Sequence, residues 1–233
     1  MSTLVTYRIE NSIATLVMDD GKANVMSLSM QSELNAALDR AVADRAVVIL
    51  TGRPGVFSGG FDLRVLMGGG SDAADMVRGG FEVAARLLAF PTPVVIACTG
   101  HAIAMGAFLL LAGDHRIGTD GSHRIQANEV AIGITMPFSA IEICRQRLAP
   151  AHFDRAVVNS EIYPPSEAVA AGFLDRIVGT SEVHEEAQRT TATLSKLDMA
   201  AHAATKLRAR DQTLKALRAA IEADDAAFRA AMG

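Results

Sequence analysis

Hydrophobic residues follow two different periods along this chain, and the period changes several times. Short apolar runs rich in β-branched residues predict strands, because helical segments of similar hydrophobicity are usually longer. Three such runs stand out, two of them apolar enough to be buried on both faces: residues 13–18 (IATLVM), 47–51 (VVILT) and 94–97 (VVIA).

Apolar residues at helical spacing separate these strands. One helix is predicted by four residues that recur every four positions: Met30, Leu34, Leu38 and Val42. Its N-cap is Ser27 or Ser29, because a hydroxyl before the first apolar position can accept a hydrogen bond from the first turn. A second amphipathic helix is expected over residues 72–88, and the glycines at 68–70 indicate a mobile loop before it.

The pattern becomes helical in the second half of the chain. Helices are predicted over residues 137–148, 151–159 and 164–172, and from about residue 181 the chain is Ala-rich, helical and free of strands. Strands that alternate with helices imply parallel pairing with the helices packed outside. The sequence therefore predicts an α/β fold, and strand-plus-helix units of similar size suit a spiral of stacked turns.

Composition and charge narrow the class of protein. Half of the 233 residues are hydrophobic and the net charge is −4, which argues against a nucleic-acid surface. Cys98 and Cys144 lie in apolar segments without further ligands nearby, so we expect buried free thiols and no metal site. The N-terminus lacks a signal-peptide pattern, and the longest apolar stretch, residues 102–113, is too short to span a bilayer. These features predict a cytoplasmic protein without a membrane partner.

Two buried strands lead into glycine-containing turns followed by helix-forming runs: GRPGVFSGGFDL at 52–63 and TGHAIAMGAFLLLAGD at 99–114. Such turns leave main-chain N–H groups free at the start of a helix. One turn alone would be read as a tight bend that needs glycine. Two such turns, with the isolated Glu129 downstream, favour an oxyanion hole with a carboxylate near it.

Four segments together resemble the crotonase superfamily, the enoyl-CoA hydratase/isomerase family. They are FSGGFDL at 57–63, residues 100–114, residues 166–175 (SEAVAAGFLD) and Lys22-Ala23-Asn24. The similarity covers about residues 5–180 in the family's order. It implies a crotonase-like spiral of ββα units over 1–180 and a homotrimer or dimer of trimers. The Ala-rich segment 181–233 is expected to be a helical tail for packing or oligomerisation.

The resemblance also assigns residues to roles. It implies oxyanion N–H groups on Phe61 and Met105 and a catalytic base at Glu129. It implies that an acyl-CoA thioester is the substrate, with coenzyme A as part of it and no further cofactor. The positions that correspond to substrate contacts are Lys22, Ala23, Phe57, Ser58, Gly59, Gly60, Asp62, Leu63, Gly106 and Phe108.

One position separates two activities. Family hydratases carry two glutamates, and the first of these positions is Phe108 here, which cannot transfer protons. One carboxylate suffices to remove a proton from C2 and return it at C4. Family isomerases that convert 3-enoyl-CoA to 2-enoyl-CoA have an apolar residue there and an N-E-x-x-x-G segment like 128–133. Family dienoyl isomerases add an aspartate where this chain has Pro137.

Other interpretations remain open or are rejected. Glu129 could instead be an exposed loop carboxylate or pair with Arg124, and the chain could be a hydratase or a catalytically weak acyl-CoA binder. We expect structural or surface roles for His101 and His115, and turn-bracing roles for Asp62 and Asp114. Residues 102–110 resemble the nucleophile turn of Clp-type serine peptidases, but Ala104 stands where they need serine, which excludes that chemistry.

Overall fold

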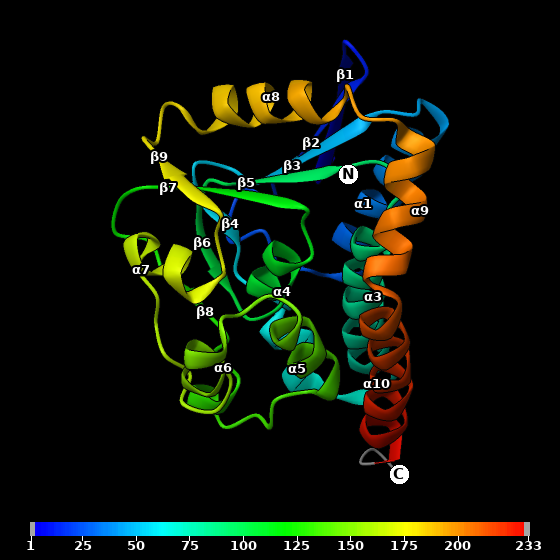
Figure 1. The fold of residues 1–233 in the computed structure, drawn as a ribbon. Helices are drawn as coiled ribbons and strands as arrows, with labels where there is room; N and C mark the ends of the chain where they lie inside the picture. The colour runs from blue at the N-terminus through cyan, green and yellow to red at the C-terminus, as the bar shows by residue number, and fades with distance from the viewer. Residues whose placement is uncertain (1–2, 231–233) are drawn as a thin grey trace.

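A computed structural model describes residues 3–230, which form two β-sheets surrounded by helices (Figure 1). The larger sheet has the strand order β1-β2-β3-β5-β7-β9, and the smaller has the order β4-β6-β8. Neighbouring strands run parallel except β1 and β2. The strands are Val5–Glu10 (β1), Ile13–Met18 (β2), Val47–Thr51 (β3), Gly55–Ser58 (β4), Val94–Cys98 (β5), Gly100–Ile103 (β6), His115–Thr119 (β7), Ile125–Gln126 (β8) and Arg176–Val178 (β9).

Helices cover both sheets, and within the described residues the chain after β9 consists of three helices and the turns that join them. They are α1 (Leu28–Ala43), α2 (Leu63–Gly68), α3 (Gly70–Leu88), α4 (Met105–Leu111), the 3₁₀ turn η1 (Val130–Ile132), α5 (Phe138–Arg145), α6 (Pro150–Val157), α7 (Pro165–Ala171), α8 (Val183–Leu194), α9 (Met199–Ala209) and α10 (Asp211–Ala230). Within residues 3–230, no helix combines the length and hydropathy needed to cross a membrane. The expected helical C-terminal segment is confirmed.

Three successive segments follow the same path from the large sheet to the small sheet and then into a helix. β3, β5 and β7 lie in the large sheet, and each is followed by a strand of the small sheet: β4, β6 and β8. The helices α2 and α4 follow β4 and β6, and α5 follows β8 after the 3₁₀ turn η1. The predicted α/β spiral with parallel sheets is therefore confirmed.

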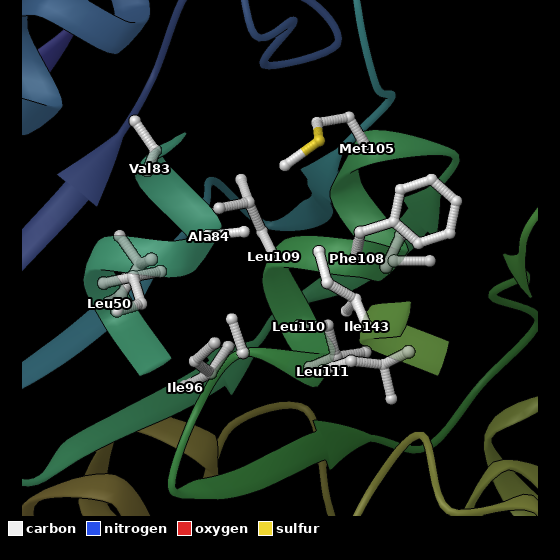
Figure 2. Close-up of a cluster of buried hydrophobic side chains, with 14 of the residues drawn as sticks. Leu50, Val83, Ala84, Ile96, Met105, Phe108, Leu109, Leu110, Leu111 and Ile143 are labelled. Atoms are coloured by element: carbon white, nitrogen blue, oxygen red, sulfur yellow. The ribbon is translucent and has the colours of Figure 1, made fainter. Parts of the chain in front are cut away.

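The large sheet is buried on both faces, which explains its continuous apolar strands. Every residue of β3 and β5 is buried. On one face, Ile49, Val95 and Ile117 pack against α8, which crosses the sheet at the top of Figure 1. On the other face the core gathers around α4, where Figure 2 shows Leu109 and Leu111 among side chains of neighbouring elements.

The sequence makes predictions for the start of α1 and for the segment between α2 and α3. Ser27 rather than Ser29 caps α1, with its hydroxyl accepting from the Met30 N–H at 3.2 Å. The prediction of a mobile loop at 68–70 is wrong, because α2 ends at Gly68 and α3 begins at Gly70, which leaves only Gly69 between them. Gly69 has a φ of +66°, a left-handed conformation that lets the chain change direction in one residue.

Candidate active site

Two turns meet at the carboxyl edge of the small sheet. β4 and β6 pair in parallel, so the residues after Ser58 and after Ile103 emerge at the same edge. Gly60, with φ +92°, lies so close to the second turn that a Cβ there would be 2.9 Å from the Ala104 Cβ. Glycine at this position therefore allows the two turns to touch.

Each turn leaves one main-chain donor free. Among residues 3–230, neither the Phe61 N–H nor the Met105 N–H donates a hydrogen bond to another protein group. Met105 begins α4, so its N–H has no partner inside the helix. Ala104 before it has φ 50° and ψ −123°, an unusual conformation for a residue with a Cβ, with a cost on the order of 1–3 kcal/mol. The strain is held by a hydrogen bond from the Ala104 N–H to the Gln126 carbonyl at 2.8 Å.

Glu129 lies between β8 and η1 and is only 7% exposed. Its carbonyl accepts from the Ile132 N–H at 3.1 Å and the Ile134 N–H at 2.9 Å, which fixes the turn that carries the side chain. Its Oε2 has no hydrogen-bond donor within the described residues. Removal from water raises the pKa of Glu129 from 4.5 to about 7, and a hydrogen bond from its own backbone offsets only part of this effect.

This geometry decides between the alternatives for Glu129. The carboxyl is buried, and within residues 3–230 no donor, Arg124 included, reaches its Oε2. The interpretations as an exposed loop carboxylate or as a partner of Arg124 are therefore wrong. An acid with a pKa near neutrality can both accept and return a proton at physiological pH.

An apolar cavity of about 670 Å³ joins these features. The two turns contribute Gly59, Phe61 and Ala104, and Glu129 lies in the same wall. The other lining residues come from α2, α3, η1, α5, α10 and the segments beside them: Leu63, Leu66, Val77, Phe81, Asn128, Ile132, Ile134, Thr135, Met136, Pro137, Phe138, Ile141, Asp224, Ala227 and Phe228.

The expected substrate contacts differ in where they lie relative to the cavity. Gly59, Phe61 and Leu63 line the cavity, whereas Phe57, Ser58, Gly60, Gly106 and the Met105 side chain are buried beside it. Lys22 and Ala23 are exposed at the rim of the first turn, where the Ala23 carbonyl accepts from the Gly59 N–H at 2.7 Å. Asp62 caps α2 by accepting from the Arg64 N–H at 2.9 Å.

Phe108 is placed one layer behind the cavity. It is fully buried and stacks on Phe81, with ring centroids 6.0 Å apart, among the core side chains of α4 (Figure 2). Phe81 lines the cavity and meets the Phe61 ring edge-on at 6.1 Å. The aromatic wall beside the turns is thus formed directly by Phe81, whose place on the apolar face of the helix 72–88 gave no sign of a role beyond the core.

A second carboxylate in the cavity wall, Asp224, was not expected from the sequence. It accepts from the Phe138 N–H at 3.0 Å, the Ser139 N–H at 2.8 Å and the Ser139 Oγ–H at 2.6 Å. It therefore caps α5, whose own N-cap is Pro137 and provides no side-chain acceptor. A signal existed: Asp224 interrupts an otherwise apolar stripe on α10 formed by Leu214, Leu217, Ile221 and Phe228.

The remaining polar residues of the two motifs have structural positions. Asp114 accepts from the Val94 N–H at 2.8 Å, as expected for a residue that braces a turn. His101 accepts from the Arg124 N–H at 3.0 Å, and His115 lies 3.9 Å from Asp175. None of these three side chains lines the cavity.

The family model for enoyl-CoA hydratase/isomerase matches residues 8–232. The chain belongs to the enoyl-CoA hydratase/isomerase family. Among curated relatives of this family, the chain is 30% identical to the mitochondrial enoyl-CoA delta isomerase 1 of Rattus norvegicus. The similarity extends over 194 residues, which are 81% of this chain and 67% of the relative.

Solved structures of the enoyl-CoA hydratase/isomerase family are still more similar. An enoyl-CoA hydratase of Mycobacterium marinum is 47% identical with a TM-score of 0.93, covering 97% of this chain and 99% of the other. A Mycobacterium tuberculosis protein is 48% identical in two structures. One, with the same TM-score and coverage, is named an enoyl-CoA isomerase. The other, with a TM-score of 0.95 and 98% of both chains covered, is named a probable enoyl-CoA hydratase. Because the names of these similar structures give different activities, even for one protein, the choice between the activities depends on the residues of the site.

Proposed function

We propose that this chain is an enoyl-CoA isomerase that converts 3-enoyl-CoA thioesters to 2-enoyl-CoA thioesters with Glu129 as its single base. The observation that carries this proposal is the inventory of carboxylates in the cavity wall. Within the described residues, the wall holds two, Glu129 and Asp224. Asp224 accepts three hydrogen bonds at the start of α5, so Glu129 alone is available for proton transfer.

The reaction follows from the positions of the donors and the base. The Phe61 and Met105 N–H groups hydrogen-bond the thioester oxygen and stabilise the negative charge that develops there. Glu129 removes a proton from C2, and the electrons move into the carbonyl to give a dienolate. The protonated Glu129 then returns the proton at C4, so the double bond moves from C3–C4 to C2–C3 and the base is regenerated.

The surroundings of Glu129 suit this chemistry. The apolar wall keeps water away from the dienolate, which would otherwise be protonated without control. The pKa of about 7 makes the carboxylate a stronger base than an exposed glutamate and the acid a ready proton donor. Hydration of 2-enoyl-CoA, the alternative activity in this family, is easier with a second free carboxylate to handle the water.

Purified protein assayed with 3-enoyl-CoA and with 2-enoyl-CoA tests the proposal. We expect turnover of the first substrate, with a loss of ~10²- to 10⁴-fold in kcat for Glu129→Gln. Glu167→Gln, at an exposed glutamate of α7, is the matched control and should retain wild-type activity. A 3-hydroxyacyl product from 2-enoyl-CoA as the main activity would support the hydratase instead. No turnover of either substrate, with a melting temperature still raised by CoA ligands, would support a binding protein.

Assembly and location form part of the same proposal. We infer a homotrimer or dimer of trimers, as the family resemblance implies, and a cytoplasmic location, as the sequence features predict. Leu197 and Leu207, 48% and 47% exposed at and beside α9, supply apolar surface for a subunit contact. Light scattering coupled to size-exclusion chromatography tests the assembly, and a monomer at micromolar concentration would contradict it.

A further inference from the structure

The last helix of the described chain forms part of the acyl cavity. α10 packs against α3 and α5, and in Figure 1 it lies on the far side of α4 and α5 from the small sheet. The first half of its apolar stripe is buried against these helices through Leu214, Leu217 and Ile221. The second half lines the cavity through Asp224, Ala227 and Phe228.

Polar contacts hold this helix in one orientation. Asp224 binds the start of α5, as described above. On the opposite flank, Arg78 of α3 pairs with Asp225 at 3.0 Å, and Arg229 pairs with Asp75 of α3 at 2.6 Å. Because contacts on two sides fix the rotation of α10 about its axis, the direction in which Phe228 leaves the helix is also fixed.

The cavity therefore has two chemically different ends. The thioester end is defined by the Phe61 and Met105 N–H groups at the edge of the small sheet. The other boundary is α10, where Phe228 is the one aromatic side chain that this helix contributes. An acyl chain that fills the apolar interior meets this side chain, because Phe228 lines the same cavity as Phe61 and Glu129.

We propose that Phe228 closes the acyl end of the cavity and so sets the longest acyl chain that the enzyme accepts. This inference rests on the proposed function for its substrate class, since it assumes that an acyl-CoA thioester occupies the cavity. Asp224 is the positioning residue that keeps Phe228 in place. A pocket discriminates between homologous chains by roughly 10- to 200-fold per methylene that it cannot accommodate.

Activity and binding are both measured against acyl length, from four to sixteen carbons. Activity is measured as kcat/KM for 3-enoyl-CoAs, and binding as Kd for saturated acyl-CoAs, which have no double bond to shift. For Phe228→Ala we expect the long-to-short ratio of kcat/KM to rise at least ~10-fold, and the long-to-short ratio of Kd to fall by a similar factor because longer chains then bind more tightly. For Phe228→Trp we expect the preferred length to become shorter. Leu217→Ala, on the same stripe but outside the cavity wall, is the matched control and should keep the wild-type preference.

The outcomes separate the two proposals. An unchanged length preference in both Phe228 variants overturns the inference, and so does an equal change in Leu217→Ala, which would indicate general loosening of α10. If the wild type binds saturated acyl-CoAs without isomerising 3-enoyl-CoA, the proposed activity fails while the Kd series still decides on Phe228.

Discussion

Glu129 links the catalytic proposal to the stability of the protein. Its carboxyl has a pKa of about 7 in the folded state because burial disfavours the charged form, whereas the unfolded chain returns it to about 4.5. Between these two values the folded state holds a proton that the unfolded state has released. Folding stability therefore decreases as the pH rises through this window, and the contribution is fully present only below about pH 4.5.

The magnitude follows from the same two numbers. Each pKa unit corresponds to about 1.4 kcal/mol, so the difference between 4.5 and about 7 amounts to roughly 3 kcal/mol of unfolding free energy. Glu129→Gln removes this titration. Relative to the wild type, the variant should therefore gain roughly 3 kcal/mol between pH 4.5 and pH 8. The cost of burying the amide of the variant does not depend on pH, so it does not affect the change in the stability difference between pH 4.5 and pH 8.

Urea denaturation of both proteins at half-unit pH intervals measures the effect, with protein concentration held fixed because subunit assembly would shift the midpoint. In parallel, kcat/KM of the wild type should fall about tenfold per pH unit below pH 7, since the free base is lost there. A stability difference between variant and wild type that does not change with pH would refute the assignment of this pKa to Glu129.

Three further substitutions test separate parts of the structure. Gly60→Ala places a Cβ 2.9 Å from that of Ala104 and should therefore cut activity by about 100-fold. The circular dichroism spectrum should stay unchanged. Wild-type activity in this variant would show that the close approach of the two turns is dispensable. Asp114→Asn leaves the buried Lys206 ammonium without its carboxylate and should cost about 3–5 kcal/mol at pH 7 by urea denaturation. The loss should be smaller at pH 9, above the Lys206 pKa of about 8. Asp224→Ala removes the cap of α5 and should lower stability by about 1 kcal/mol, seen as a melting temperature lower by roughly 2–4 °C.

The parts of the fold that could be predicted from sequence are those with a local signal. β3 and β5 are continuous apolar runs because both faces of the large sheet are covered, and their pattern identified them directly. The strands of the small sheet were not predicted. β4, β6 and β8 contain two to four residues, and parallel pairing with one another stabilises them rather than any propensity of their own.

The residues of the site also divide into those with a local sequence signal and those without one. Phe61, Met105 and Glu129 lie in motifs with fixed spacing, so the resemblance could assign them roles. Asp224 and Phe228 belong to a helix whose contact with α5 spans more than 80 residues of sequence, and no periodicity specifies which face of one helix meets the start of another. Asp224 in an apolar stripe could have been flagged as anomalous, but its partner could not have been named.

The contribution of α10 to the cavity wall also affects the order in which the enzyme matures. Chains emerge from the ribosome N-terminus first, so Glu129 and both turns can be in place before residues 211–230 have been synthesised. At that stage the acyl cavity is open to water along one side. A stalled or proteolysed fragment that ends near residue 210 would thus carry the whole catalytic apparatus without the enclosure that protects the dienolate.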